Sequence, residues 1–151
     1  MKGLIQRVSH ASVHVGDEEI AAIPAGLLVF VGVEKMDDTE HARKLCQKLM
    51  AYRVFSDSQG RMNQSVMDSQ GSLLLVPQFT LAANTRSGTR PGFSDAAPPE
   101  KARPLFDFMI AEASAVLGSA RVAAGRFGAD MKVSLVNDGP VTFLLEVPSA
   151  P

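Results

Sequence analysis

The chain contains little cysteine and few aromatic residues. Cys46 is its only cysteine, tryptophan is absent, and aromatic residues make up 6% of the 151 positions. A single cysteine excludes a disulfide within the chain and favours a reducing compartment. Because 46% of the residues are hydrophobic and few of these are aromatic, the core must be largely aliphatic. The length fits one domain, so we expect residues 1–151 to form a single domain.

Strong net charge and long apolar runs are absent as well. The formal net charge is −1, which excludes binding of nucleic acid through a bulk positive field, so any RNA contact must be local and small. The longest apolar run, residues 26–33, is far shorter than the ~20 residues that a membrane helix needs. The first residues lack the apolar segment of a signal peptide. We therefore expect a soluble, cytoplasmic protein that does not contact a membrane.

The common catalytic and metal-binding motifs are also missing. The sequence contains no glycine-rich nucleotide loop, no G-x-S-x-G, no H-E-x-x-H and no C-x-x-C. His10 and His14 would share one face of a strand, but no third metal ligand lies near them in the sequence, which favours solvent-facing polar residues. Cys46 lies on the apolar stripe of a predicted helix, which favours a core residue over a nucleophile. We expect no metal and no cofactor.

The hydrophobic periodicity predicts a mixed, α+β fold. Apolar residues recur three and four positions apart over 37–53 and 99–118, the pattern of two amphipathic helices. Strands are predicted at 3–15, 20–23, 27–33, 72–81, 121–124, 131–137 and 141–147, with short strands or a hairpin-like loop in 54–70 and a long loop over 82–99. No regular alternation of strand and helix appears. We therefore expect an antiparallel, barrel-like β-sheet body with two helices packed on it.

In two short segments, polar residues or residues with unusual backbone conformations, glycine and proline, lie next to apolar strands. In the first, Gln78 and Thr80 alternate with apolar residues, and because threonine is a good strand former, a structural role is the simpler interpretation. In the second, Asn-Asp-Gly at 137–139 would close a hairpin, yet Pro140 removes an N–H from the strand that follows. Either Pro140 ends a turn, or a rigid Gly139-Pro140 unit is held toward a ligand or partner.

Several segments, distributed along nearly the whole chain, resemble those of the D-aminoacyl-tRNA deacylase family in amino-acid sequence, order and spacing. The most specific are QFTLAANTRSGTRPGF at 78–93 and GRFGADMKVSLVNDGPVT at 125–142, accompanied by 6–13, 26–33, 53–68 and 144–146. The chain departs from the family pattern at Pro77, Asn84 and Gly92, where serine, aspartate and serine are usual.

The resemblance implies a cytoplasmic homodimer that hydrolyses the ester joining a D-amino acid, or glycine, to the terminal adenosine of tRNA. The 3′ end of aminoacyl-tRNA would be its partner, and no other protein partner is implied. The Gly139–Pro140 bond would be cis, and the pair would enter the other subunit's active site. Its carbonyls would there occupy the space that an L-side chain needs. Arg7 would brace the pair, and Pro77 and Met131 would belong to the same substrate-binding set.

The same resemblance makes Thr80 the active-site threonine, with Phe79 and Gln78 beside it. An aminoacyl ester is already activated, so hydrolysis needs a placed water and donors for the oxyanion, which the N–H groups near Phe79 and Thr80 would supply. We expect Thr80 to position the substrate while the ribose 2′-hydroxyl helps to activate the water. Two alternatives remain: a general esterase with Thr80 as nucleophile, and a non-catalytic dimeric module that binds RNA ends or small ligands.

Overall fold

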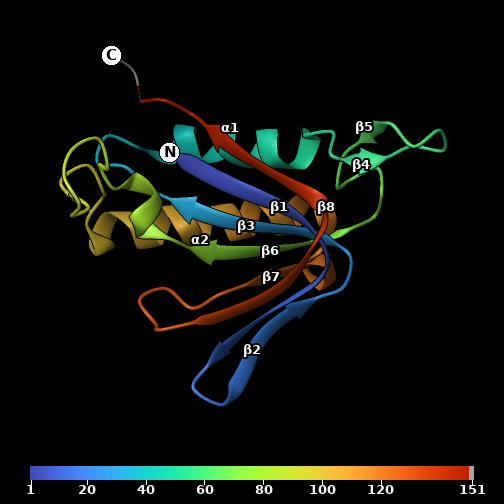
Figure 1. Ribbon diagram of the computed structural model, residues 1–151, viewed down its shortest axis with the longest axis horizontal. Coiled ribbons are helices and arrows are strands. Elements are labelled where there is room, and N and C mark those ends of the chain that lie inside the picture. Colours follow the sequence, from blue (N-terminus) through green and yellow to red (C-terminus); the bar gives the residue numbers. More distant parts are fainter. Residues whose placement is uncertain (150–151) are drawn as a thin grey trace.

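The computed structural model describes residues 1–149 (Figure 1). Its elements are, in chain order, β1 (Lys2–Val15), β2 (Glu18–Ile23), β3 (Gly26–Gly32), α1 (Thr39–Ala51), β4 (Phe55–Ser56), β5 (Met62–Gln64), β6 (Ser72–Pro77), η1 (Phe79–Ala82), α2 (Pro99–Leu117), η2 (Ser119–Arg121), β7 (Val122–Ala124) and β8 (Lys132–Glu146). The short β4–β5 pair is antiparallel, which confirms the short strands predicted between residues 54 and 70.

The main sheet is mixed. Its strand order is β2-β1-β3-β6-β7, with β8 on the other edge of β1. β1 pairs antiparallel with β2, β3 and β8, as predicted, whereas β3–β6 and β6–β7 are parallel. Parallel neighbours need a long crossover, and the segments that contain α1 and α2 supply one each. The expectation of an antiparallel sheet is therefore corrected to a mixed one, because the two helices lie between parallel strands.

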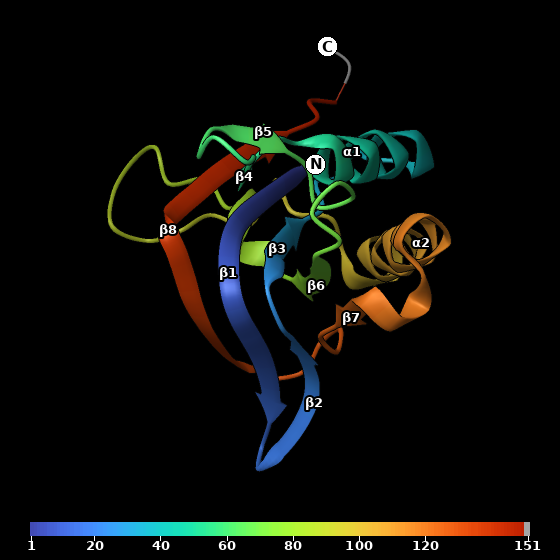
Figure 2. The same ribbon diagram turned by 90° about the vertical axis from the view of Figure 1, so that its right-hand side faces the viewer.

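The sheet curls into a nearly closed, barrel-like body, and both helices lie on its outer side (Figure 2). Alternate residues of β3 and β6 face opposite ways: Leu27 and Leu73 belong to the core beneath the helices, whereas Leu28 and Leu74 belong to the core inside the curl. Both faces of these strands are therefore apolar. The predicted barrel-like body with two helices packed on it is confirmed.

The two helices begin and end within about two residues of their predicted bounds. Asp38 caps α1 by accepting hydrogen bonds from the N–H groups of Glu40 (2.9 Å) and His41 (3.1 Å), and the His41 side chain accepts one from the Asp38 N–H. α2 begins with Pro99 and is followed by Gly118 at φ +88°. None of the helices in the described part of the chain is long and apolar enough to cross a membrane.

β6 ends at Pro77, earlier than the predicted strand 72–81, and the chain turns into η1. The Gln78 N–H donates to the Val31 oxygen (2.8 Å), but Pro77 has no N–H to offer on its other side, where β7 pairs only as far as Leu75. A Cβ at Gly32 would lie 2.8 Å from that of Leu81, so the glycine lets η1 pack closely on β3. The alternation around Thr80 thus belongs to a helical turn and not to a strand.

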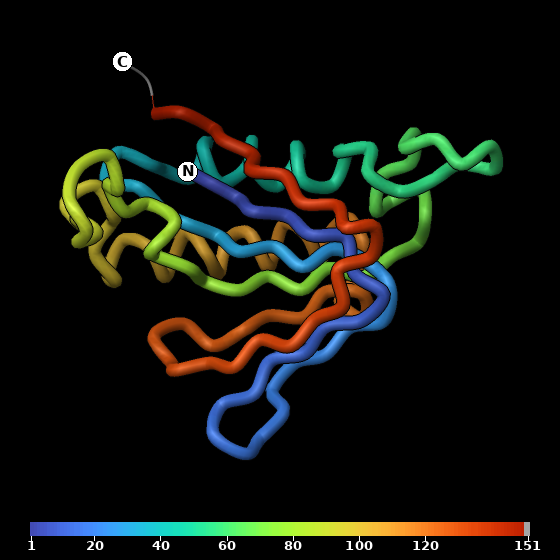
Figure 3. The backbone as a smooth tube through the Cα atoms, in the orientation of Figure 1, coloured from blue at the N-terminus to red at the C-terminus, as the bar shows by residue number. Residues whose placement is uncertain are grey.

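The two strands predicted at 131–137 and 141–147 are one strand, β8, and both halves pair with β1 (Figure 3). Asn137 lies opposite Val8 and Thr142 opposite Gln6, so residues 138–141 all face the single residue between them, Arg7. The predicted chain reversal is therefore wrong. The segment is a bulge, a place where a strand tolerates proline because no ladder partner is lost. The Gly139–Pro140 peptide bond is cis, as expected.

Candidate active site

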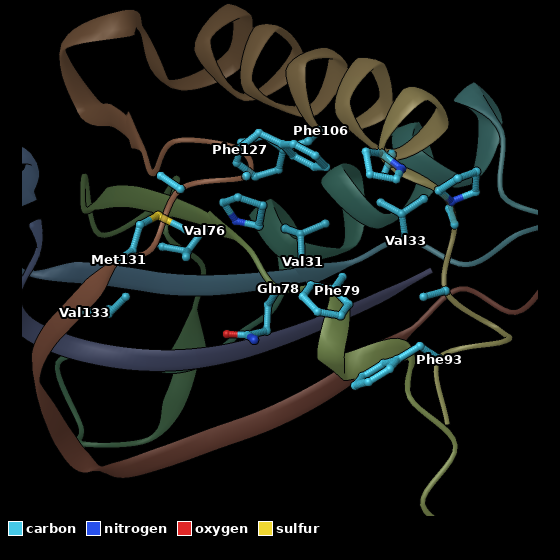
Figure 4. A pocket seen from close by; sticks show the side chains of 18 residues that line it. Val31, Val33, Val76, Gln78, Phe79, Phe93, Phe106, Phe127, Met131 and Val133 are labelled. Carbon is cyan, nitrogen blue, oxygen red and sulfur yellow. The ribbon is translucent and has the colours of Figure 1, made fainter. Parts of the chain in front are cut away.

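A cavity of about 600 Å³ lies at the carboxyl ends of β3 and β6, between these strand ends and α2 (Figure 4). Gln78 carries the only polar side chain among its lining residues, and none of them is charged. The others are Val31, Val33, Val76, Pro77, Phe79, Phe93, Ala96, Ala97, Pro98, Pro99, Ala102, Phe106, Phe127, Gly128, Ala129, Met131 and Val133. The cavity therefore contains no side chain that can act as a general base.

Gln78, Phe79 and Thr80 lie where β6 passes into η1, at the edge of this cavity. The Gln78 side-chain amide donates a hydrogen bond to the Thr80 hydroxyl oxygen. Phe79 is 59% exposed and packs against Phe93, which is 45% exposed, with ring centroids 5.3 Å apart at an interplanar angle of 54° (Figure 4). Two partly exposed aromatic rings therefore flank the cavity beside the only polar side chain of its wall.

The main-chain N–H groups of Phe79 and Thr80 have no partner within η1, because the first N–H groups of a helix lack an intrahelical acceptor. Within residues 1–149, neither group donates to any other main-chain or side-chain acceptor. Two N–H donors, one on a lining residue and one on the residue after it, are therefore without a partner in the described part of the chain.

Gly139 and Pro140 lie on the exposed bulge of β8 and are not among the residues that line the cavity. Arg7 holds the bulge: its Nε donates to the Asp138 oxygen (2.9 Å), and its Nη1 donates to the Val54 oxygen (2.7 Å). The resemblance implied that Arg7 braces the Gly-Pro pair; the two carbonyls that accept from Arg7 belong to the neighbouring Asp138 and to Val54.

Asn137 also holds the bulge, a role that the sequence reasoning missed. Its Oδ1 accepts from the Val141 N–H (3.0 Å) and its Nδ2 donates to the Thr142 hydroxyl (2.8 Å). The amide thus spans the base of the bulge and closes it. The signal was present in the sequence, because asparagine side chains often bond to main-chain groups a few residues away, but Asn137 was interpreted only as a turn-former.

The predicted site residues thus fall into two groups. The first group lines the cavity and consists of Pro77, Gln78, Phe79 and Met131, with Thr80 hydrogen-bonded to Gln78. The second group meets at the bulge and consists of Arg7, Gly139 and Pro140. Phe93 was not predicted as a site residue, although it lies within the segment 82–99 that was expected to be a long loop.

Histidine and cysteine side chains lie away from the cavity. His41 caps α1, and in the part of the chain that the structure describes no three His, Cys, Asp or Glu side chains gather as they would to hold a metal ion. Burial, with a smaller contribution from the charge of Glu112, raises the pKa of the Cys46 thiol to about 11. Cys46 is fully enclosed in the core beneath the helices, so the interpretation of Cys46 as a core residue is supported.

Comparison with models of known protein families shows to which family the chain belongs. The family model described as D-Tyr-tRNA(Tyr) deacylase matches residues 4–146. The chain belongs to the D-Tyr-tRNA(Tyr) deacylase family. This confirms the predicted family resemblance, which rested mainly on the segments at 78–93 and 125–142.

Relatives from this deacylase family are similar to this protein over almost the whole chain. A protein of Marinobacter nauticus named D-aminoacyl-tRNA deacylase is 63% identical over 146 residues, which cover 97% of this chain and 94% of the relative. A protein of Stutzerimonas stutzeri with the same name is 61% identical and covers 97% of this chain and 99% of the relative. The similarity therefore includes both the cavity and the bulge.

Solved structures agree on the fold. The structure of a protein named c-Myc DNA Unwinding Element Binding Protein superposes with a TM-score of 0.94 at 38% identity and covers 98% of this chain and 99% of its own. A probable eukaryotic D-amino acid tRNA deacylase superposes with a TM-score of 0.84 at 16% identity, over 97% of this chain and 98% of its own, which shows a shared fold.

Proposed function

We propose that this chain hydrolyses the ester bond of D-aminoacyl-tRNA and releases the free D-amino acid and tRNA. Membership of the family and the name of the close relatives support the predicted function. The observation that carries it is an uncharged cavity beside which the N–H donors of Phe79 and Thr80 have no partner within residues 1–149. Such a site suits an acyl group that is already activated. We extend the proposal to glycine attached to a non-cognate tRNA, because glycine also lacks an L-side chain.

In the proposed reaction a water oxygen attacks the ester carbonyl, the bond to the ribose 3′-oxygen breaks, and a proton passes to that oxygen. The N–H groups of Phe79 and Thr80 stabilise the oxyanion, a contribution of roughly 3–4 kcal/mol per donor in other acyl-transfer enzymes. Since no side chain of the cavity can accept a proton, the adjacent ribose 2′-hydroxyl of the substrate helps to activate the water. The ester is an activated acyl group, so the proposed reaction uses no cofactor.

Thr80 acts in this proposal as a positioning group. A nucleophilic threonine needs a neighbouring base to take its proton. The group bonded to the Thr80 hydroxyl is the Gln78 amide, which donates a hydrogen bond and cannot take a proton at neutral pH. The Thr80 hydroxyl keeps its own hydrogen to donate, and Gln78 fixes where it lies.

The Gly139-Pro140 pair rejects L-aminoacyl groups in the cavity of a second copy of the chain. The pair is exposed and lies outside its own cavity, which is the arrangement that exchange between two copies requires. Among the described residues β8 has a strand partner on one edge only, and it carries the exposed side chains of Val136 and Leu144. An L-side chain would clash with the main chain of the pair. A monomer in light scattering that keeps full activity at the same concentration contradicts this arrangement.

We further propose that residues 1–151 act as one domain in the cytoplasm, with aminoacyl-tRNA and a second copy of the chain as the only partners. The matched family region, residues 4–146, spans nearly all of this sequence and supports a single domain.

Two substrates separate the proposed function from its alternatives. The chain is incubated with D-aminoacyl-tRNA and, separately, with a small activated ester that lacks a nucleoside. A deacylase releases the amino acid from the tRNA and leaves the small ester intact. Hydrolysis of both at similar kcat/KM indicates a general esterase, and tight binding of the tRNA without release indicates a binding module.

A further inference from the structure

The segment that contains β6, η1 and the loop up to Ser94 carries charge of one sign only. Residues 69–94 contain no aspartate and no glutamate, and their only charged side chains are those of Arg86 and Arg90. The chain as a whole has a formal net charge of −1, so this is a local positive region in a slightly acidic protein. Such a region attracts anions without a bulk positive field.

Arg86 and Arg90 lie on a loop that is closed at its base. Asn84 and Gly92 exchange two main-chain hydrogen bonds, of 2.7 and 2.9 Å, and the Asn84 side chain accepts a third from the Arg86 N–H (3.0 Å). Both arginines are exposed, and within residues 1–149 neither guanidinium makes a salt bridge or a side-chain hydrogen bond. Their donors are therefore free to bind a ligand.

The base of this loop adjoins the mouth of the cavity. η1, which starts at Phe79, ends at Ala82, two residues before Asn84, and Phe93 directly follows Gly92. Phe79 and Phe93 both line the cavity and both expose about half of their side chains. The seven residues from 85 to 91 reach at most about 12 Å from the base, at roughly 3.4 Å per extended residue out and back. The guanidinium groups thus lie within a few nucleotides of a substrate ester bound in the cavity.

We propose that Arg86 and Arg90 bind phosphates of the single-stranded 3′ end of tRNA, next to the nucleotide whose ester occupies the cavity. This inference rests on the proposed function. The guanidinium fork matches phosphate oxygens with two parallel donors. Cationic side chains combined with exposed aromatic rings are the usual means of binding single-stranded nucleic acid. The loop then supplies affinity for the RNA, while the cavity supplies the chemistry.

The test compares two substrates that carry the same ester. Full D-aminoacyl-tRNA has phosphates, and D-aminoacyl-adenosine has none. In the double variant Arg86→Gln/Arg90→Gln, KM for the tRNA is expected to rise about tenfold with kcat unchanged, whereas kcat/KM for the adenosine ester stays at the wild-type value. Loss of two phosphate contacts should also make the affinity for tRNA less sensitive to salt. Between about 50 and 200 mM salt, the affinity of the wild type should fall by a factor about sevenfold larger than that of the variant.

Matched variants separate the role of these arginines from their charge. Arg61→Gln/Lys48→Gln removes the same charge from the β4–β5 connection and from the last turn of α1, neither of which lines the cavity, and is expected to leave KM unchanged. Arg86→Lys/Arg90→Lys keeps the charge and is expected to recover most of the affinity. Thermal melting of the Arg86 and Arg90 variants should match the wild type, because neither guanidinium makes a salt bridge or a side-chain hydrogen bond within residues 1–149.

Two results overturn the inference: an unchanged tRNA KM in the double glutamine variant, or an equal loss on the adenosine ester, which makes the loop a part of the cavity wall. Binding of uncharged tRNA, followed by fluorescence anisotropy, is measured in parallel because it needs no turnover. Arginine-dependent binding without hydrolysis refutes the deacylase proposal alone. Arginine-independent binding with hydrolysis refutes this inference alone.

Discussion

The Nε of Arg7 donates a hydrogen bond to the main-chain oxygen of Asp138 over 2.9 Å, at the point where four residues of β8 face one residue of β1. The same guanidinium reaches the Val54 oxygen, which follows the end of α1. One side chain therefore ties the bulge that carries Gly139 and Pro140 to a segment far away in the sequence. The position of the proposed selectivity element depends on this contact.

Replacing Arg7 should loosen the bulge. Arg7→Ala leaves two carbonyls without their charged donor, and we expect a loss of about 1–3 kcal/mol in the free energy of unfolding together with a fall of at least about tenfold in D-aminoacyl-tRNA hydrolysis. Arg7→Lys should be intermediate, because an ammonium group is a single point donor. Chemical denaturation and single-turnover kinetics measure both effects. The control for activity is Arg43→Ala, which removes an arginine bonded to Glu40 and placed over the Phe108 ring, away from the bulge. Wild-type behaviour of Arg7→Ala would show that its contact has no role.

Gly139→Ala should impair activity through the shape of the bulge. The φ of Gly139 is +143°, and a Cβ there would lie 2.6 Å from Val141 Cγ2 and 3.3 Å from Arg7 Nη2. The bulge must shift to relieve this overlap, so we expect D-aminoacyl-tRNA hydrolysis to fall at least about tenfold, the effect of roughly 1.4 kcal/mol on a barrier.

The control for this variant is Gly16→Ala. Gly16 also has a positive φ, +58°, but a Cβ there meets no atom within 4 Å. Both variants should lose stability of the order of 1 kcal/mol from the backbone alone, and only Gly139→Ala should lose activity. Equal activity of the two variants would mean that the bulge plays no part in the reaction.

Thr80→Val should lower kcat only about tenfold, since it removes one hydrogen bond worth roughly 1.4 kcal/mol and leaves the main-chain donors in place. Thr80→Ser should keep nearly full activity. Loss of a true nucleophile costs on the order of 10⁶ in kcat in a serine protease. Intact-mass measurement of acid-quenched reactions should find no aminoacyl adduct, and an adduct on Thr80 would establish the esterase alternative.

Cys46 should be inert in the folded chain. Burial raises the pKa of its thiol to about 11, so thiolate is scarce at pH 8 and the sulfur is enclosed. Iodoacetamide at pH 8 should therefore label the protein only after denaturation and leave its activity intact. Cys46→Ala should lose about 1–2 kcal/mol of stability from the small cavity it leaves while kcat stays unchanged. Rapid labelling with loss of activity would place Cys46 in the reaction.

Local patterns predicted the elements but not all of their pairing. The helices followed from the spacing of their apolar residues, a signal contained within a few neighbouring positions, and Asp38 and Gly118 lie at the helix ends in the structure. The parallel pairing of β3 with β6 depends on residues far apart in the chain, and no local signal indicates it. Pro140 was equally ambiguous: four turn-forming residues predict a chain reversal, and only the pairing of both flanks with β1 turns the segment into a bulge.

The residues of the candidate site could be predicted only where they belong to sequence motifs shared with the family. Gln78, Phe79 and Thr80 were named from the resemblance, but their strand-like alternation predicted the wrong local structure, because the loss of an N–H at Pro77 and the close packing at Gly32 are tertiary effects. The uncharged character of the cavity could not be foreseen, since its wall is assembled from segments between Val31 and Val133. The bracing role of Asn137 likewise required the bulge to be known.

The most direct test of the account measures hydrolysis of D- and L-aminoacyl-tRNA that carry the same amino acid on the same tRNA. Single-turnover rates are determined with the protein in excess over the tRNA. We predict release from the D-ester at a rate at least about a hundredfold above that from the L-ester, the ratio that roughly 2.7 kcal/mol in the barrier produces. Equal rates for the two esters, or no release from the D-ester, would contradict the account.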